Sequence, residues 1–287
     1  MSLRVGYLGP PGTYSHQAAL QQFSKLETKR EVSYLPQKSI AACFKSVNDG
    51  TIDYALVPFE NSSNGQVVFT YDLFKEWFMN GGELKPKFKI ISEQFVPIHH
   101  NLITYSDCIE KITKIYSHPQ VWTQCREFLA DLDVEKQDTS STSKAVEILV
   151  QLNDHTTAAI ASATASDVYN VPILQNNIED NSNNTTRFLC LGHNPLSSST
   201  TEEPNMHLVT FSIKENQQPG SLCDILAEFK SHGLNLASIT TRPSSIPWQY
   251  VFFVEVWDGP GLYEVLENIK DLVTEVAVVG SFNRKLK

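Results

Sequence analysis

The sequence predicts an α/β fold in which a two-lobed domain is followed by a smaller domain with its own element order. Before residue 193 the apolar pattern alternates between strand and helix, which is typical of a mostly parallel sheet covered by helices. The alternation restarts after a long strand-like passage from about residue 90, and another strand follows at 185–191. The long passage would carry the chain from a first lobe to a second, and the strand at 185–191 would return it to the first. The sequence therefore indicates two lobes joined by two crossings, with a cleft between them.

The first lobe opens with a strand at 4–8, and the turn Gly9-Pro10-Pro11-Gly12 then leads into a helix. Thr13 or Ser15 begins that helix, Ser39 caps the next one, and Gly50 ends it. The expected elements of this lobe are strands at 4–8, 32–35 and 54–58 and helices at 15–23, 39–48 and about 67–79.

The second lobe repeats the alternation, and the C-terminal part has a different order. Residues 193–205, HNPLSSSTTEEPN, are rich in Ser, Thr and Pro, which is typical of a linker. The second lobe is expected to contain strands at 112–116, 134–137 and 158–161 and helices at 121–132 and 143–152. Beyond the linker, strands at 207–213, 235–241, 250–256 and 276–282 and helices at 221–231 and 262–272 give the ferredoxin-like order βαββαβ.

Composition narrows the class of protein. The chain has 287 residues, 41% of them hydrophobic, and a net charge of −9, which argues against a nucleic-acid surface. There is no signal-peptide pattern and no stretch of about 20 apolar residues, so we expect a cytoplasmic protein. The five cysteines form no CxxC pair, and no metal-binding motif is present, so neither a disulfide framework nor a metal is expected.

Polar side chains recur where predicted strands end, and this recurrence indicates a binding site. Ligands of α/β sheets bind outside the carboxyl ends of the strands. For each segment alone, helix capping or a turn is the simpler explanation. Together they favour a site of neutral hydrogen-bond donors with one cation, Arg187, for which an internal salt bridge to Glu60 is the alternative. The segments are Glu60-Asn61-Ser62-Ser63, Ser117-His118-Pro119-Gln120 with Gln124, Ser140-Ser141-Thr142-Ser143 and Asn184-Thr185-Thr186-Arg187.

Four motifs in this order and spacing resemble the prephenate dehydratase family: GPPGTYSHQAAL, VPFENSSNGQV, YSHPQVWTQC and NTTRFLCLG. The tail resembles the ACT regulatory domain of that family. The resemblance implies a catalytic domain similar to type II periplasmic binding proteins, at 1–192, and an ACT domain at 206–287. It places lobe 1 at about 1–98 and 181–192 and lobe 2 at about 99–180.

The resemblance also implies an activity and its regulation. Prephenate would bind in the cleft and lose CO2 and its ring hydroxyl to give phenylpyruvate, without a cofactor. Phenylalanine would bind the ACT domain, which dimerises, and would inhibit by closing the cleft. A homodimer or homotetramer is therefore expected. Arogenate dehydratase and a non-catalytic cytosolic ligand-binding sensor are the alternatives.

The family's site residues carry over onto matching positions. The catalytic set is Thr186, Asn61, Ser117, Gln124 and Glu60. The substrate-binding set is Arg187, Thr13, Ser15, Ser62, Ser141 and Thr142. The phenylalanine-binding set is Gly220, Ser221, Leu222, Asn235 and Leu236. The family's ESRP motif reads Thr240-Thr241-Arg242-Pro243 here, so its glutamate is absent.

Roles follow from the chemistry. Aromatisation of the ring drives the reaction, so the enzyme has to hold a dianion and help hydroxide leave. The hydroxyl of Thr186 is too weak an acid to ionise, and we expect it to hydrogen-bond the leaving oxygen while Asn61, Ser117 and Gln124 position the substrate. Glu60 is either an acid with a raised pKa or a residue that orients a neighbour, and orientation is favoured.

Overall fold

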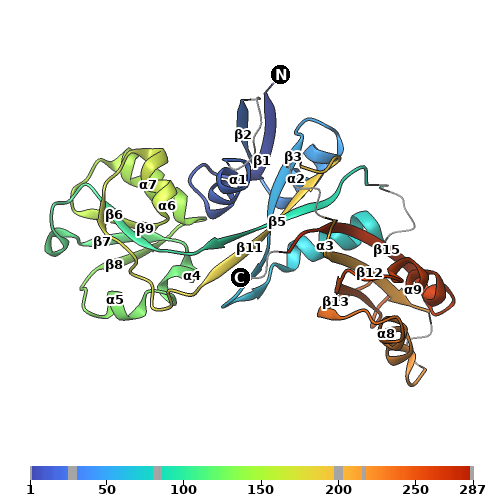
Figure 1. Cartoon of the computed structure of the whole chain (residues 1–287). Coiled ribbons are helices and arrows are strands. Elements are labelled where there is room, and N and C mark those ends of the chain that lie inside the picture. Colours follow the sequence, from blue (N-terminus) through green and yellow to red (C-terminus); the bar gives the residue numbers. More distant parts are fainter. Residues whose placement is uncertain are drawn as a thin grey trace. The chain divides into compact units, whose positions relative to one another are not determined.

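The computed structural model describes residues 2–24, 31–79, 84, 86–196, 203–214 and 218–284. The chain forms two compact units. Unit 1 consists of residues 1–43, 55–66 and 94–188, and unit 2 of residues 44–54, 67–93 and 189–287. The strands β3 (Tyr54–Asn61), β5 (Lys89–Pro97) and β11 (Thr185–Gly192), which are labelled in Figure 1, have residues in both units.

In unit 1, one set of strands lies in the order β11-β3-β1-β2. Strands β1 (Leu3–Leu8) and β2 (Val32–Gln37) pair in parallel along their whole length, and α1 (Tyr14–Ser24) lies between them in the chain. This arrangement confirms the predicted strand–helix–strand unit. The short β4 (Gly65–Gln66) folds back on the end of β3 as an antiparallel partner.

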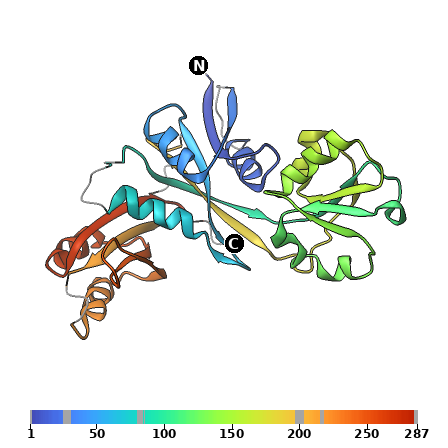
Figure 2. The same cartoon turned by 180° about the vertical axis from the view of Figure 1, so that it is seen from behind.

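The second sheet of unit 1 has helices on both faces. Its strand order is β10-β6-β9-β7-β8, with bounds Ile173–Gln175, Asn101–Thr104, Thr157–Ala161, Lys114–Ser117 and Glu135–Asp138. Leu102 and Ile160 pack toward α4 (Pro119–Trp122) and α5 (Arg126–Ala130), while Ile103 and Ala159 pack toward the opposite face. Figure 2 shows that opposite face covered by α6 (Thr142–Leu152) and α7 (Ala163–Tyr169). Successive strand residues thus fill two separate cores, as the pleat requires.

Two sequence expectations for this lobe were wrong in detail. The helix predicted at 121–132 is two short helices, α4 and α5. The carboxylate of Asp180 accepts hydrogen bonds from the backbone N–H groups of Arg126 (3.0 Å) and Glu127 (3.1 Å), and so starts a new helix there. The strand-like passage from residue 90 is also divided, because β5 ends at Pro97 and β6 begins at Asn101.

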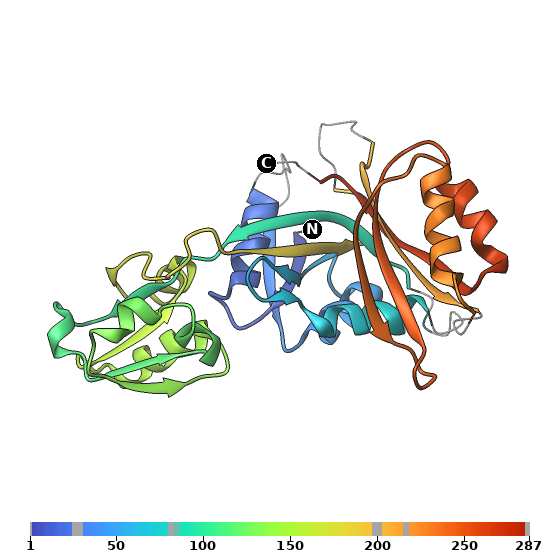
Figure 3. The same cartoon turned by 90° about the horizontal axis from the view of Figure 1, so that it is seen from below.

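Unit 2 contains the predicted βαββαβ order. Strands β12 (Met206–Ile213), β13 (Leu236–Pro243), β14 (Tyr250–Trp257) and β15 (Val273–Phe282) form an antiparallel sheet in the order β13-β14-β12-β15. Helix α8 (Ser221–Ser231) and helix α9 (Leu262–Asn268) with the 3-10 turn η2 (Ile269–Asp271) cover one face, and their apolar residues form one core with the sheet (Figure 3). The predicted helix at 262–272 is therefore confirmed, except that its last turn is a 3-10 turn and not α-helix.

The other face of this sheet carries a helix from the N-terminal half of the chain. Helix α3 (Val68–Phe78) contacts β13 and β15 (Figure 3). The centre of the Tyr71 ring lies 5.3 Å from that of the Phe253 ring. Helix α2 (Ile40–Asn48) has its first residues in unit 1 and the rest in unit 2. The Ser39 hydroxyl caps this helix by accepting a hydrogen bond from the N–H of Ala42 at 3.1 Å.

Two further expectations stand as follows. No helix within the described ranges is long and apolar enough to cross a membrane. The lobe boundaries after residues 98 and 180 stay a prediction. Residues 197–202 of the predicted linker lie outside the described residues.

Candidate active site

Asn61 organises the turn that follows β3. Its side-chain oxygen accepts hydrogen bonds from the backbone N–H groups of Ser63 (3.0 Å) and Asn64 (2.9 Å). Such a bond pattern lets an Asn side chain stand in for a backbone turn. Gly65 completes the turn with φ of 78°, and β4 then pairs back onto Asn61. The polar run at the end of the strand is thus a tight turn built around one amide.

The amide nitrogen of Asn61 points to the start of β11. It donates to the hydroxyl oxygen of Thr186 at 2.9 Å and to the side-chain oxygen of Asn184 at 2.8 Å. Both amide protons are therefore used, and the oxygen of Thr186 is an acceptor. The single proton of Thr186 remains to be donated elsewhere. An O–H group whose oxygen already accepts a hydrogen bond is a stronger donor, because hydrogen bonds in a chain polarise one another.

Arg187 is the buried cation beside this pair. It is only 5% exposed, its guanidinium lies 4.7 Å from the centre of the Phe59 ring, and its Nη2 lies 3.3 Å from a carboxylate oxygen of Glu60. The Glu60 side chain is 44% exposed. The salt bridge that the sequence offered as an alternative is thus present. Direct contact of Arg187 with a substrate carboxylate stays a prediction.

Gln124 belongs to a second polar group in unit 1. Its amide lies 2.8 Å from Nε2 of His100, and Nδ1 of His100 lies 3.0 Å from the hydroxyl of Tyr14. The backbone N–H of His100 donates to Glu179 at 2.8 Å, and Nδ1 of His99 lies 2.6 Å from the other oxygen of that carboxylate. Burial lowers the pKa of His100 despite the nearby charge of Glu179.

The loop before α1 is hydrogen-bonded to α6 and to the start of α7. The hydroxyl of Ser162 donates to the carbonyl oxygen of Gly12 at 2.9 Å, and that of Ser143 donates to the carbonyl oxygen of Pro11. Gly12 has φ of 85°, and a Cβ there would lie 2.8 Å from Cα of Ala165. The N–H of Gly12 donates to Nδ1 of His16 at 3.1 Å. Glycine is required here both by the backbone conformation and by the close approach of α7.

Several predicted hydroxyls are occupied by protein partners. The Thr13 hydroxyl donates to the carbonyl oxygen of Leu8 and accepts from the N–H of His16; the Ser117 hydroxyl donates to the carbonyl oxygen of Ile160; the Ser62 hydroxyl accepts from the N–H of Thr185; and the Ser141 hydroxyl caps α6. By contrast, the hydroxyls of Ser15 and Thr142 have no hydrogen bond within the part of the chain that the structure describes.

The structure thus brings some of the predicted residues together and leaves others apart. Asn61 bonds to Thr186, Glu60 pairs with Arg187, and Ser62 bonds to the backbone of Thr185 between Asn184 and Thr186. Among the described residues, no hydrogen bond or ion pair joins Thr186 to Ser117, Gln124 or Ser141.

Sequence reasoning missed three polar residues at these groups: Tyr14, His100 and Glu179. Tyr14 stands inside a motif that was singled out, so its position was a usable signal, and Asn184 belongs to a segment that was already named for the site. His100 follows His99 in the strand-like passage of the sequence, and on a strand these two side chains would point to opposite faces, which argues against a shared site. His100 instead lies in the break between β5 and β6, where no such alternation applies. Glu179 had no sequence signal, because its partners are distant in the chain.

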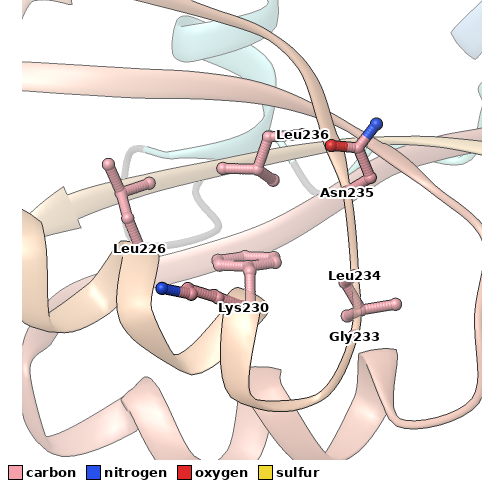
Figure 4. A pocket seen from close by; sticks show the side chains of 7 residues that line it. Leu226, Lys230, Gly233, Leu234, Asn235 and Leu236 are labelled. Carbon is pink, nitrogen blue, oxygen red and sulfur yellow. The ribbon is translucent and has the colours of Figure 1, made fainter.

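The predicted phenylalanine-binding residues line two pockets in unit 2, each of about 460 Å3. Asn235 and Leu236 line the first, together with Leu226 and Lys230 of α8 (Figure 4). The second lies at the start of α8 and is lined by Gly220, Ser221 and Leu222, with Ile213, Gln218, Cys223, Trp248, Tyr250 and Phe252 around them. Both volumes fall within the range of small-molecule sites, roughly 300–1,000 Å3.

The segment that replaces the ESRP motif is tied to α3. Nε and Nη2 of Arg242 donate to the two carboxylate oxygens of Asp72 at 2.9 and 3.0 Å. Lys75, one turn further along α3, donates to the carbonyl oxygen of Pro243 at 2.7 Å. Burial works against ionisation of Asp72, but the hydrogen bonds and charges of Arg242 and Lys75 outweigh it and lower its pKa.

Comparisons with known proteins agree with the motifs. The sequence model of the family described as prephenate dehydratase matches residues 5–196, and that of the ACT domain matches residues 207–274. A probable prephenate dehydratase of Saccharomyces cerevisiae is 36% identical over 99% of this chain and 97% of its own length.

Two more relatives bear on the substrate and the regulator. A chloroplastic arogenate dehydratase/prephenate dehydratase of Arabidopsis thaliana is 33% identical over 84% of this chain and 57% of its own length. The solved structure of a prephenate dehydratase from Arthrobacter aurescens in complex with L-Phe has a TM-score of 0.80 and 26% identity, covering 98% of this chain and 90% of that one.

Proposed function

Because this chain belongs to the prephenate dehydratase family and carries an ACT domain, we propose that it converts prephenate to phenylpyruvate, CO2 and water. The chain is an enzyme, a carbon–oxygen lyase whose reaction is decarboxylating. In the proposed step the bond from the ring to its carboxylate breaks and its electrons enter the ring. The bond from the ring to its hydroxyl breaks at the other end, and the departing hydroxide takes a proton to become water.

The observation that carries this proposal is the hydrogen bond between Asn61 and Thr186. Because Asn61 donates to the oxygen of Thr186, the proton of the Thr186 hydroxyl is left to be donated to the leaving oxygen of the substrate. The bond from Asn61 also polarises this hydroxyl and makes it a stronger donor. Thr186 would therefore be the catalytic residue that hydrogen-bonds the departing hydroxide. Asn61, whose own polar atoms are engaged by the protein, would act as a positioning residue for Thr186.

The remaining predicted site residues take two kinds of role in this proposal. Arg187 supplies the positive charge that favours a dianionic substrate, and Glu60 orients its guanidinium. Ser15, Thr142 and Gln124 offer groups to the substrate. Four further residues already have protein partners for their hydroxyls and would shape the site without binding the substrate: Thr13, Ser62, Ser117 and Ser141.

The test is phenylpyruvate formation from prephenate by the purified protein, beside Thr186→Ala and Thr186→Ser. We expect Thr186→Ala to lower kcat by orders of magnitude with little change in KM, because the lost bond acts on the transition state. Thr186→Ser keeps a hydroxyl and should retain much more activity. Full activity of Thr186→Ala would reject the role of Thr186. No turnover by the wild type would favour a ligand-binding sensor.

Arogenate is a second candidate substrate, supported by the Arabidopsis relative, whose name includes both activities. Arogenate carries an ammonium group where prephenate carries a ketone. Measuring kcat/KM for both compounds on the same preparation decides between them. A higher value for arogenate would overturn the assignment of prephenate.

We further propose that phenylalanine inhibits the enzyme by binding the ACT domain and favouring a closed cleft, in a cytoplasmic homodimer or homotetramer. The L-Phe complex of the Arthrobacter relative and the two pockets of unit 2 support this. Because Thr240 stands where the family has a glutamate, the strength of inhibition by phenylalanine has to be measured on this chain. A flat curve of activity against phenylalanine would reject the regulation, and sedimentation would establish the assembly.

A further inference from the structure

We propose that His100 is a positioning residue that sets the direction of the Gln124 amide. As the neutral tautomer protonated at Nδ1, His100 accepts a hydrogen bond from the amide nitrogen of Gln124 and so leaves the Gln124 oxygen to face the substrate. The role of Gln124 toward a substrate rests on the function proposed above. The state of His100 rests only on the contacts around it.

The first step of the argument is the hydroxyl of Tyr14, which has one proton and two close neighbours. It lies 2.8 Å from the carbonyl oxygen of His99, which can only accept, and 3.0 Å from Nδ1 of His100. Tyr14 must therefore give its proton to the carbonyl. Nδ1 of His100 must then carry a proton and donate it to the oxygen of Tyr14, since two acceptors would otherwise face each other.

The second step concerns the other ring nitrogen. A neutral imidazole with a proton on Nδ1 has a bare Nε2, which can only accept. The amide atom of Gln124 that lies 2.8 Å from Nε2 of His100 is assigned as the oxygen Oε1. Because a bare Nε2 can only accept, that atom must be the nitrogen of the NH2 group. The oxygen and nitrogen of an amide are told apart by the hydrogen bonds around them, and rotating the amide by half a turn satisfies every bond in this chain.

The third step is the charge of His100, which is only 2% exposed. Burial disfavours its charged form, as does the neighbouring His99, whereas Glu179 favours that form. The Gln124 amide would favour the charged form only with its oxygen toward the ring. The hydroxyl of Tyr14 in α1 also lies against His100. Burial raises the pKa of this phenol and so keeps it protonated. A neutral ring at pH 7.5 follows, because burial outweighs the opposing contacts.

A consequence follows for acid solution. When His100 takes up a proton, Nε2 becomes a donor, and the Gln124 amide has to offer its oxygen to the ring. The amide would then present its NH2 group in the opposite direction. The group offered to a substrate is therefore coupled to the protonation of His100, which acts through Gln124.

The direct test is 15N NMR of the full-length protein with labelled histidine at pH 7.5. The signal of His100 is identified by its loss in His100→Asn. We expect a protonated Nδ1 and a bare Nε2. A proton on Nε2, or on both nitrogens, would overturn the proposal. This readout needs no turnover, so an inactive wild-type enzyme with the expected tautomer would reject the proposed function and leave the state of His100 standing.

Variants test the consequence for activity. His100→Asn can still donate to Tyr14 but has no group at the position of Nε2. We expect it to lower kcat by about tenfold, by analogy with the residues that orient the ligands of metal sites. His100→Gln can place an amide oxygen near that position and should recover most of the loss. The matched control is His155→Asn, at an exposed histidine bonded to the carbonyl oxygen of Tyr105. Equal activity of both His100 variants would contradict the role in positioning Gln124.

Discussion

At the residue scale, the side chain of Asn61 both stabilises the turn after β3 and donates a hydrogen bond to Thr186, and one substitution can separate these two functions. Asn61→Asp keeps an acceptor for the N–H groups of Ser63 and Asn64 but loses the donor to Thr186. A carboxylate would instead accept the Thr186 proton and withdraw it from the substrate. We expect kcat to fall by about a hundredfold or more, as for loss of one transition-state hydrogen bond. The thermal midpoint should change little.

Asn61→Ala is the companion variant, because it removes the turn as well as the donor. We expect a loss of activity similar to that of Asn61→Asp together with a clear fall in the thermal midpoint. Wild-type activity in Asn61→Asp would show that the bond to Thr186 does not position the hydroxyl for catalysis.

Glu60→Gln distinguishes an acid from an orienting residue. If Glu60 only orients Arg187, the amide keeps a hydrogen-bond acceptor near the guanidinium, and kcat should fall by less than about tenfold. The pH dependence of kcat should keep its shape. A much larger fall in kcat with loss of one limb of the pH profile would instead identify Glu60 as the general acid.

At the scale of elements, the loop before α1 depends on Gly12 for contact with α7. Gly12→Ala places a methyl group against Ala165 in a left-handed backbone conformation, and we expect a loss of stability of about 1–3 kcal/mol. Gly50→Ala is the control, since Gly50 has φ of 71° but no atom within 4 Å of an added Cβ. Urea unfolding of both variants isolates the contact. Equal losses would show that the packing against α7 contributes nothing.

Helix α3 connects the regulatory sheet with the turn at Asn61, because it begins two residues after β4 ends. Asp72→Asn weakens the paired bonds to Arg242, at a cost of about 1 kcal/mol. We expect unchanged activity without phenylalanine and a shift of about fivefold in the half-inhibitory concentration. Asp107→Asn, which weakens an exposed ion pair with Lys111, is the control. Identical inhibition curves would exclude this helix as the link.

At the scale of the whole molecule, His16 and His100 couple stability to pH. Burial lowers the pKa of both in the folded protein below the ordinary value of 6.5. Below that value the unfolded chain binds protons that the folded protein does not. Stability should therefore fall as the pH drops from about 6.5 toward the folded-state pKa, by at most about 1.4 kcal/mol per pH unit for each histidine.

Urea unfolding between pH 7.5 and 5 measures this dependence. His16→Asn keeps an acceptor for the N–H of Gly12 without a titrating group. Its stability should change less with pH than that of the wild type, whatever its absolute value. An identical slope in both proteins would mean that His16 does not contribute.

Local patterns predicted most of the secondary structure because they reflect local causes. Ser39 caps α2 as expected, and the βαββαβ order of the C-terminal part follows from apolar periodicity and turns. The break at Thr123–Cys125 was missed because the cap of α5 comes from Asp180, far along the chain. A helix boundary set by a distant carboxylate leaves no mark in the residues that form the helix.

The sequence by itself determined the family, the fold class and the motif residues, because motifs and periodicity are properties of neighbouring residues. Only the tertiary structure decided what those residues do for one another. It showed that Asn61 serves Thr186, that Arg187 already has Glu60, and that Gln124 is held by a histidine which no motif indicated. Hydrogen-bond partners are shared between segments that only folding brings together, and so the direction of each bond is fixed by the fold.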